Sequence, residues 1–408
     1  MRRRALAAVL TAVVATSACA SSAAPTVKSG PGVTESTISL GVLTDMSGPF
    51  APTALVRIKG YELFIGELNA RGGICGRKVE LTTKDHGFTV QRALDGYFDL
   101  EPKVLGFLDI TGAAMTAAIA PDLIQTRALA APVSWSAALL GNPHMMIVGG
   151  TYDIDVMNGL DHLKRDGVIA DGDTIGHVHV EGDFGTNALE GSTFAAQQWG
   201  MTLVEKPVAE SADDLGAQIA ALKAQNARAV VLSTSPAQTA LAVAAAAALG
   251  WDVPFLVNVA GFDPAILKSL AAPAVMKQVQ VVSPIAPYGA DAAGPQAVAK
   301  AFEARYPDLE ANGAVNHGYA VAMAFAAVLE KACAEKDLTR DGVLRAFQDT
   351  NGVETSGLTG QLRFSLAGRP SATQSYMARP DDKVKGGLVV TEKLFESELV
   401  KAKGTRAK

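Results

Sequence analysis

The chain has 408 residues, of which 49% are hydrophobic, and it carries a formal net charge of −5 at pH 7. This length exceeds one ordinary domain, and the apolar content is sufficient for two buried cores. Acidic and basic residues are interspersed, with no basic stripe to neutralise phosphates. Composition and charge therefore exclude nucleic acid as an expected partner.

The N-terminal end differs in composition from the rest. Arg2, Arg3 and Arg4 precede an apolar run over residues 5–15, which is too short for a comfortable membrane span and is typical of an export signal. The run ends in TSAC, and the small residues before Cys19 resemble a bacterial lipobox, although Thr16 stands where that pattern prefers a large aliphatic residue. We expect residues 1–18 to be a signal peptide and Cys19 to be lipidated; the alternative is an ordinary signal peptide with an incidental cysteine. Lipidation would hold the exported protein at the cell surface or at the periplasmic face of the cytoplasmic membrane.

Residues 19–37 are rich in Ser, Gly and Pro, which cannot build a core, so they predict a lipid-anchored linker. The remaining cysteines are Cys75 and Cys333. An exported protein meets an oxidising compartment, where these two could form a disulfide. The alternative is two unpaired small core residues, because the sequence does not supply the Cα separation that a disulfide requires.

From Ile38 onward, strand-like apolar runs alternate with segments of helical periodicity. The first half predicts a strand from residue 38, a helix that ends at Gly72 and Gly73, strands over 78–85, 104–110 and 128–134, and helices over 91–100 and 114–126. The pattern then restarts, with strands over 174–180, 201–208, 227–234 and 254–259 and helices over 188–200, 214–226 and 238–250. This alternation predicts an α/β protein with two Rossmann-like lobes, each with a parallel sheet covered by helices on both faces.

A helix over 318–335 and a strand-rich end follow the second half, which suggests that the chain crosses between the lobes more than twice. We expect the lobes to be discontinuous and joined by a hinge. The predicted boundaries are 38–153 and 284–360 for the first lobe, 154–283 and 361–395 for the second, and 396–408 for a C-terminal tail.

Small residues recur where predicted strands end and helices begin. In open parallel sheets, ligands bind at these junctions because unpaired amides and the helix dipole point there. In the first junction, DMSGPFA, Ser47 offers a hydroxyl cap, Gly48 permits close approach and Pro49 suits a first helical position. Similar junctions occur at DITGAAMT, VSWSAA, EGDFGTNA, STSPAQ and NVAGFD. They predict a ligand cleft, and we include Ser47 and Phe50 among its candidate contacts.

Four segments occur in a recognisable order: GVLTDMSGPFA, ELNARGGICGRKVEL, VEGDFGTNALEG and NHGYAVAMA. Together they resemble the leucine/isoleucine/valine-binding family of type I periplasmic binding proteins, over nearly all of residues 38–395. The resemblance implies an extracytoplasmic, monomeric solute-binding component that captures a small molecule between two closing lobes. It also implies an ABC permease and, through it, ATPase subunits as partners, with no cofactor and no catalytic activity.

In that family the carboxylate of the ligand meets backbone amides and hydroxyls of the first lobe. The matching positions here are Gly112, Ala113, Ala114, Ser134, Trp135 and Ser136. Trp135 stands where the amino-acid receptors place a small hydroxyl residue, so we expect a pocket of different shape. Phe184 matches a position whose aromatic side chain covers the ligand, and Tyr152 lies near the first crossing between lobes; both are expected walls.

One departure bears on the ligand class. Amino-acid-binding members place a carboxylate, which holds the ammonium of the ligand, where we align Ala260, and their partner aromatic aligns with Ser235. A buried ammonium without a countercharge is costly. We therefore expect a ligand that is not an amino acid, such as an aromatic or apolar carboxylate or amide, unless Asp263 or Asp153 reaches in from a neighbouring position.

Other kinds of function stay open as alternatives. His177 and His179 share one face of a strand, but no further ligands complete a zinc site, so no metal is expected. The sequence has no dinucleotide fingerprint, phosphate-binding loop or nucleophile elbow. The alternatives are a ligand-sensing ectodomain and an α/β enzyme, and a nucleophile and base within hydrogen-bond reach in the cleft would indicate the enzyme.

Overall fold

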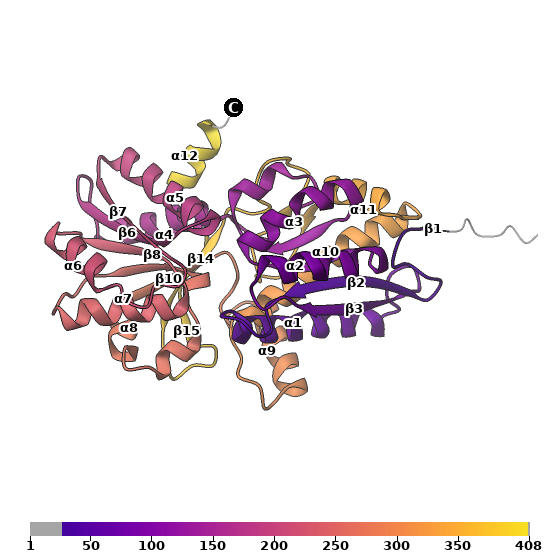
Figure 1. Cartoon of the computed structure of the whole chain (residues 1–408), viewed down its shortest axis with the longest axis horizontal. Helices are drawn as coiled ribbons and strands as arrows, with labels where there is room; N and C mark the ends of the chain where they lie inside the picture. The colour runs from indigo at the N-terminus through magenta and orange to yellow at the C-terminus, as the bar shows by residue number, and fades with distance from the viewer. Residues whose placement is uncertain (1–26, 407–408) are drawn as a thin grey trace, which may run out of the picture.

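The protein forms two lobes side by side, each built on its own sheet (Figure 1). The structure, a computed structural model, describes residues 27–406. The expected signal peptide and Cys19 lie outside the described residues.

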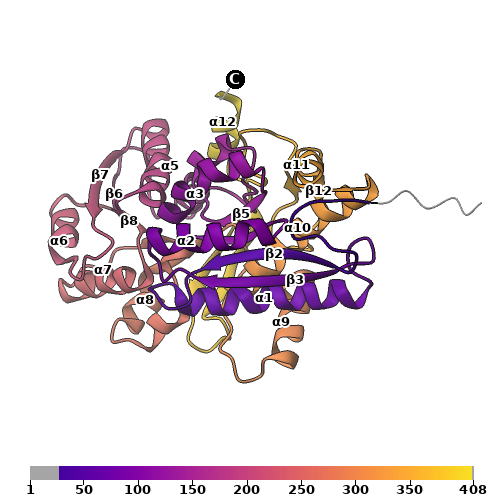
Figure 2. The ribbon, with the colours of Figure 1, turned by 45° about the vertical axis from the view of Figure 1, so that its right-hand side comes forward.

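The first lobe contains a parallel sheet in the spatial order β3 (Lys78–Asp85), β2 (Thr37–Thr44), β4 (Gly106–Thr111) and β5 (Ala130–Val133). One face is covered by α1 (Ala51–Ala70) and α10 (Ala314–Ala334), and the other by α2 (Val90–Leu100) and α3 (Ala113–Thr126). Figure 2 shows α1 and α2 on opposite sides of β2 and β3. The remaining elements are β1 (Lys28–Ser29), η1 (Glu101–Lys103), η2 (Ala137–Gly141), α9 (Ala293–Arg305), β11 (Asp337–Leu338), α11 (Arg340–Gln348), β12 (Asn351–Val353) and β13 (Leu362–Arg363).

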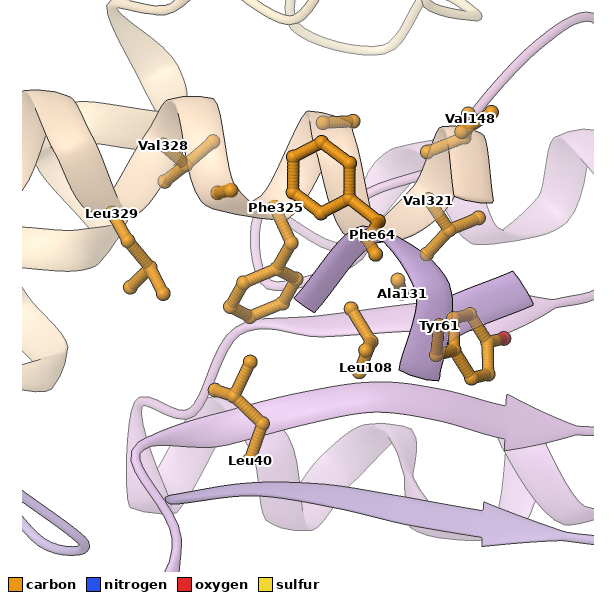
Figure 3. Packing of buried hydrophobic residues seen from close by; sticks show 14 of the residues in the cluster. Leu40, Tyr61, Phe64, Leu108, Ala131, Val148, Val321, Phe325, Val328 and Leu329 are labelled. Carbon is orange, nitrogen blue, oxygen red and sulfur yellow. The ribbon is translucent and has the colours of Figure 1, made fainter. Parts of the chain in front are cut away.

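Helices α1 and α10 approach closely because each has a glycine at the contact. A Cβ on Gly60 would lie 2.3 Å from the carbonyl oxygen of Val315, and one on Gly318 would lie 2.1 Å from that of Arg57. The core between these helices and the sheet includes Leu40, Tyr61, Phe64, Leu108, Val321 and Phe325 (Figure 3). The packing also fixes Arg57 on α1 and His317 on α10, both of which reach the cleft between the lobes.

The second lobe contains a larger sheet, in the order β15 (Leu388–Phe395), β14 (Ser375–Pro380), β10 (Val279–Ser283), β9 (Phe255–Asn258), β8 (Ala229–Ser233), β6 (Thr174–Val180) and β7 (Thr202–Val208). The strands from β10 to β7 are parallel, and β14 and β15 add an antiparallel edge. One face is covered by α4 (Tyr152–Arg165), α5 (Asp183–Trp199) and α12 (Glu398–Arg406), and the other by α6 (Gly216–Ala224), α7 (Pro236–Ala248) and α8 (Ala272–Gln278). The two sheets confirm the predicted α/β class.

Three chain segments connect the lobes, and they meet beside Gly149. The first leads to α4, the second leaves β10 at Pro284, and the third passes Ser371 and Ala372 toward β14. Gly149 has a φ of +109°, and its N–H donates to Ser371 Oγ at 3.0 Å. A Cβ at Gly149 would lie 3.1 Å from the Cβ of Pro284. Only glycine fits this crowded backbone conformation without strain, and the hinge that the sequence predicts would lie at this meeting point of the three segments.

The boundaries of the lobes, the linker and the tail differ from those expected from the sequence near both ends of the chain. Strand β13 pairs with β12, and Phe364 and Ala372 are buried in the first core, so the last crossing lies near Ala372 rather than Gly360. The expected tail instead contains α12, whose Leu399 and Val400 are buried with α4. Part of the expected linker is also paired, because β1 adds to β11. The partners of β1 and α12 are distant in sequence, so no local pattern reveals these two contacts.

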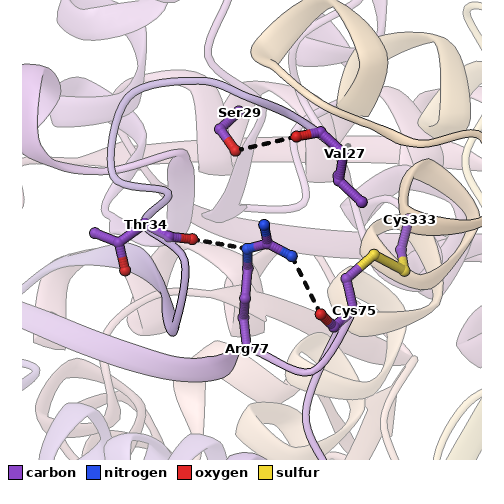
Figure 4. Close-up of a disulfide and its surroundings, with 6 residues drawn as sticks. All are labelled: Val27, Ser29, Thr34, Cys75, Arg77 and Cys333. Atoms are coloured by element: carbon purple, nitrogen blue, oxygen red, sulfur yellow. Dashed lines mark hydrogen bonds between the residues drawn. A yellow bond between two sulfur atoms is a disulfide. The ribbon is translucent and has the colours of Figure 1, made fainter. Parts of the chain in front are cut away.

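Cys75 and Cys333 form a disulfide, with their Cα atoms 5.8 Å apart (Figure 4). Cys75 lies in the turn between α1 and β3, and Cys333 lies in the last turn of α10. The guanidinium of Arg77 donates to the carbonyl oxygens of Cys75, at 3.1 Å, and Thr34, at 2.7 Å. The bond joins residues 258 positions apart, and removal of a native disulfide typically costs about 2–5 kcal/mol.

A carboxyl group is buried close to the hinge, at Asp155 in the first turn of α4. It is 1% exposed and accepts a hydrogen bond at 2.7 Å from Ser375 Oγ, which itself accepts one from Asn158 at 2.8 Å. Burial raises the pKa of Asp155 to about 8, and the charge of Asp153 adds to the rise. The folded protein therefore holds a proton here that the unfolded chain releases at neutral pH.

We predict that this proton makes stability fall with rising pH. A raised carboxyl pKa contributes stability that is complete below the ordinary aspartate range and is lost as pH rises through about 8. Asp155→Asn removes the titration, so its free energy of unfolding should fall less steeply between about pH 5 and about pH 8, by up to about 1.4 kcal/mol per unit. Urea unfolding across this range measures both slopes. The exposed Asp213→Asn should keep the slope of the unmodified protein, and an equal slope in Asp155→Asn would contradict the assignment.

Candidate ligand-binding cleft

A cavity of about 420 Å³ lies between the two lobes. The first lobe lines it with the N-terminal ends of α1, α3 and α10, and the second lobe with those of α4, α5 and α7 and with η3 (Val259–Gly261). In parallel sheets the strand carboxyl ends and helix N-terminal ends share one edge, so these edges face each other across the cleft. The volume is in the range of small-molecule sites.

Aromatic side chains form much of the cavity wall. Trp135 contacts Tyr152 with ring centroids 6.0 Å apart, and Tyr152 contacts Phe184 at 4.5 Å. Phe50 and Phe88 form a second pair at 4.9 Å. The indole N–H of Trp135 donates to the carbonyl oxygen of Val148 at 2.9 Å, which fixes the ring. Further apolar lining comes from Val133, Val180, Val259, Phe262, Ile285 and Leu388. Such walls suit a ligand with an apolar body.

Arg57 is a buried cation on this apolar surface, 3% exposed. Its Nε donates to Asp109 at 3.0 Å, and its Nη2 donates to Thr44 at 3.0 Å and Thr111 at 2.7 Å. Burial acts to lower the pKa of Arg57, but the Asp109 carboxylate and the neighbouring Tyr61 raise it above its usual value. Nη1 makes no hydrogen bond to a described residue, so it is the donor available to a bound ligand.

His317 lies beside Arg57 and Trp135. Its ring centroid is 4.7 Å from that of Trp135, and the residue is 5% exposed. Burial, with the positive charge of Arg57, lowers the pKa of His317 well below its ordinary value, so the imidazole is neutral. A neutral imidazole presents one donor and one acceptor to the cavity.

Two helix N-termini add favourable potential for an anion. The N-cap of α3 is Gly112, with a φ of +98°, and no side chain caps this helix. At α10, Asn312 Oδ1 accepts from the amide of Ala314 at 2.9 Å, and both residues line the cavity. The uncapped amides at the start of α3 and the dipoles of both helices favour negative charge at these ends. Together with Arg57 they make one end of the cavity suitable for a carboxylate.

The structure separates the candidate residues named from the sequence into two groups. Those that line the cavity are Phe50, Gly112, Ala113, Trp135, Tyr152, Phe184, Ser235 and Ala260. Those that do not are Ser47, Ala114, Ser134 and Ser136. Ser47 instead donates to Asp85 at 2.7 Å, Ser136 accepts from the amide of Ala138 at 3.3 Å, and Ser134 is 1% exposed. The expected contacts of Ser47 and Ser136 are thus corrected, because turn and capping geometry determines where these side chains point. Ser134 also lies outside the lining, and its Oγ is buried without a hydrogen-bond partner among the described residues.

The acids that could have held an ammonium group are engaged elsewhere. Asp263 accepts from the amide of Ala265 at 2.8 Å, and Asp153 pairs with Lys403. Neither residue lines the cavity. Among the described lining residues, Glu210 is the one acid, and it is exposed to solvent. The buried part of the lining therefore provides no countercharge for a cationic ligand group.

Sequence reasoning missed several lining residues, notably Arg57, Phe88, Phe262 and His317. A signal existed for Arg57, which shares the buried face of α1 with Ala54, Ile58 and Tyr61, because a charged residue on an apolar helix face is rarely buried unless paired. His317 lies within NHGYAVAMA but carries no local sign of its position. Phe88 and Phe262 reach the cavity from loops, where no periodic pattern exists.

The histidines and helices of the described chain have other roles than metal binding or membrane spanning. Among residues 27–406, no group of three or more His, Cys, Asp and Glu side chains could hold a metal ion. His177 instead makes hydrogen bonds with Ser192 at 2.8 Å and Ser233 at 2.9 Å, and His179 bonds Glu205 at 3.0 Å. None of the described helices combines the length and apolarity needed to span a membrane.

A family model described as periplasmic binding protein matches residues 37–385. The chain belongs to this family. The family and the fold that the sequence predicted are therefore confirmed, and the protein is a ligand-binding protein of the ABC transporter substrate-binding type. No curated protein matches the sequence significantly.

Solved structures support the same assignment. A fatty acid ABC transporter substrate-binding protein from Thermomonospora curvata is 35% identical, with a TM-score of 0.88, over 92% of this chain and 96% of that one. A branched-chain amino acid ABC transporter protein from Thermus thermophilus with bound valine is 15% identical, with a TM-score of 0.78, over 91% and 100%. A leucine-binding protein from Thermotoga maritima is 15% identical, with a TM-score of 0.76, over 88% and 99%. The last two likenesses concern the fold.

We predict that Arg57 and Asp109 act as a unit in stability. Arg57→Gln leaves the Asp109 carboxylate buried without its cation, which should lower the free energy of unfolding by about 3–5 kcal/mol. The double variant Arg57→Gln/Asp109→Asn removes both charges and should recover part of this loss. Urea unfolding measures both, and the half-exposed Arg92→Gln, which breaks an ion pair with Asp85, should cost less than about 1 kcal/mol. Equal losses in the single and double variants would contradict the coupling.

Proposed function

We propose that this protein is the extracytoplasmic solute-binding component of an ABC importer and that its ligand is an apolar carboxylic acid of the fatty acid class. One observation carries the proposal: an apolar cavity between the lobes is lined by a single buried cation, Arg57, and by no buried acid. Nη1 of Arg57, with the amides at the start of α3, would hold the carboxylate, and His317 would donate a further hydrogen bond. The aromatic walls would enclose the hydrocarbon chain.

An amino acid fits this cavity poorly. Its carboxylate has partners at Arg57, but its ammonium would be buried against Ala260 and Ser235 without a countercharge. The similarity to the fatty acid substrate-binding protein from Thermomonospora curvata supports the carboxylic acid assignment, since it extends over 92% of this chain at 35% identity.

The proposed transport role follows from the two-lobed architecture. A ligand that contacts both lobes stabilises the closed arrangement around the hinge at Gly149. Here Arg57 and Trp135 belong to the first lobe, whereas Phe184 and Phe262 belong to the second, so an acid bound along the cavity touches both. The closed monomer would then dock on a membrane permease that its ATPase subunits drive.

The ligand class is tested by calorimetric titration with straight-chain acids and alcohols. Affinity for hexanoic, octanoic and decanoic acids should rise about fourfold per methylene, which corresponds to about 0.8 kcal/mol of burial each. Octanoic acid should bind at least about tenfold more tightly than octanol, because hydrogen bonds to a charged group contribute about 1.5–3 kcal/mol. Micromolar or tighter binding of leucine, with weaker binding of octanoic acid, would refute the proposal.

The position of the carboxylate is tested in the double variant Arg57→Gln/Asp109→Asn. Without the guanidinium, the preference for octanoic acid over octanol should shrink at least about tenfold, while octanol affinity stays within a few-fold of the unmodified value. The exposed Arg92→Gln serves as the control and should keep the full preference. An unchanged preference in the double variant would place the carboxylate elsewhere.

We further propose that the exported protein is anchored by a lipid on Cys19, behind a signal peptide of residues 1–18. A lipid of this kind would keep the receptor close to its permease. In bacteria that carry the gene, the protein should occur in the membrane fraction, and Cys19→Ala should release it into the soluble or secreted fraction. An unmodified N-terminus found by mass spectrometry beyond Cys19 in the membrane-derived protein would exclude the anchor.

A further inference from the structure

A second cavity, of about 550 Å³, adjoins the first between the lobes. The two cavities share Pro264 and Gly386 as lining residues. Gly386 has a φ of +81° and no side chain, and a Cβ there would lie 2.6 Å from the Cβ of Tyr288. Gly386 therefore packs directly against Tyr288, and the lining that the two cavities share is one glycine and one proline from the second lobe.

The second cavity has a mixed lining, in which apolar side chains lie beside Lys268, Glu303, Glu310, Asp382 and Lys385. Of the apolar side chains, Tyr288, Phe302, Tyr306 and Leu309 come from the first lobe, and Leu267 and Val384 come from the second. Two of these apolar side chains are exposed to solvent, Leu309 at 45% and Val384 at 36%. An apolar surface that remains open beside an apolar binding cavity is suited to a hydrocarbon segment.

The charges in this lining are largely neutralised by pairs between the lobes. Lys268 pairs with Glu310, and Lys385 pairs with Glu303 at 2.9 Å. Asp382 also lies in the lining and is exposed to solvent. Both lysines are paired with acids in these exposed ion pairs, which reduces their attraction for a second carboxylate. The chemical class that fits is an uncharged aliphatic chain.

We propose that the two cavities form one binding site for long-chain acids, with the carboxylate at Arg57 and the distal methylenes beyond Gly386 in the second cavity. This inference rests on the proposed function and extends it to chain length. Short acids occupy only the first cavity, whereas long acids continue past Pro264. Since both lobes supply the second cavity, the distal chain adds contacts that exist only in the closed arrangement.

The test measures affinity against chain length in variants that fill the second cavity. Val384→Trp in the second lobe and Leu309→Trp in the first each enlarge a side chain that lines the second cavity but not the first. Leu270→Trp is the matched control, because Leu270 is 103% exposed and lines neither cavity. Calorimetric titration with octanoic, dodecanoic and palmitic acids is done on each. The filling variants should bind octanoic acid within about threefold of the unmodified protein and palmitic acid at least about tenfold more weakly. The control should match the unmodified protein for all three acids.

Several outcomes would overturn the extension. Equal palmitic acid affinity in the unmodified protein and both filling variants would show that the second cavity takes no part. Equal affinities of the unmodified protein for dodecanoic and palmitic acid would also show that the second cavity takes no part, without the use of any variant. In both cases tight binding of octanoic acid would leave the proposed function intact. If octanoic acid itself does not bind to the unmodified protein, the proposed function fails, and this inference fails with it.

Discussion

The buried ion pair between Arg57 and Asp109 anchors the edge of the first lobe that faces the cleft. The guanidinium of α1 reaches the carboxyl ends of β2 and β4 through Thr44, Thr111 and Asp109, so one side chain joins a helix to two strands. At 3% exposure an unpaired guanidinium would be strongly destabilising, and the carboxylate offsets that cost. The pairing lets a cation lie on an otherwise apolar wall, with one amino group left for a ligand.

A second constraint is the contact between α1 and α10. Because Gly60 and Gly318 lack side chains, the two helix backbones meet directly, and the disulfide between Cys75 and Cys333 ties the far end of the same pair. The contact sets His317 beside Arg57 and against Trp135. The packing of the two helix backbones therefore holds Arg57 and His317 close together. This packing does not depend on the rotamers of side chains.

In the proposed binding mode, the apolar walls of the cavity contribute affinity, and the polar groups at one end orient the ligand. Apolar walls supplied by both lobes give a binding free energy that grows with the area buried, and this gain is nearly independent of which apolar ligand supplies it. In the proposed binding mode, orientation depends on the few polar groups at one end, where Arg57 and the helix N-termini would hold an anion. The lining residues include no buried acid, so an ammonium group of a ligand would lack a countercharge. The cavity therefore disfavours ligands with a positively charged group.

The sequence by itself determined the α/β class, the alternation of strands and helices over residues 38–134 and 174–259, the family and part of the cleft, but it did not predict α4, α8, β10, α9 or α11. These features follow from local periodicity and from small residues at strand ends, as for β3 and β6, whose bounds match the prediction. It also indicated, through Ala260 and Ser235, that the ammonium partners of the amino-acid receptors are missing. Only the tertiary structure decided that Arg57 and His317 meet, that Ser134 and Ser136 stay outside the cavity, and that residues near Ala372 carry the last crossing. Each depends on contacts between segments far apart in the chain, and the geometry of such contacts leaves no pattern in local sequence.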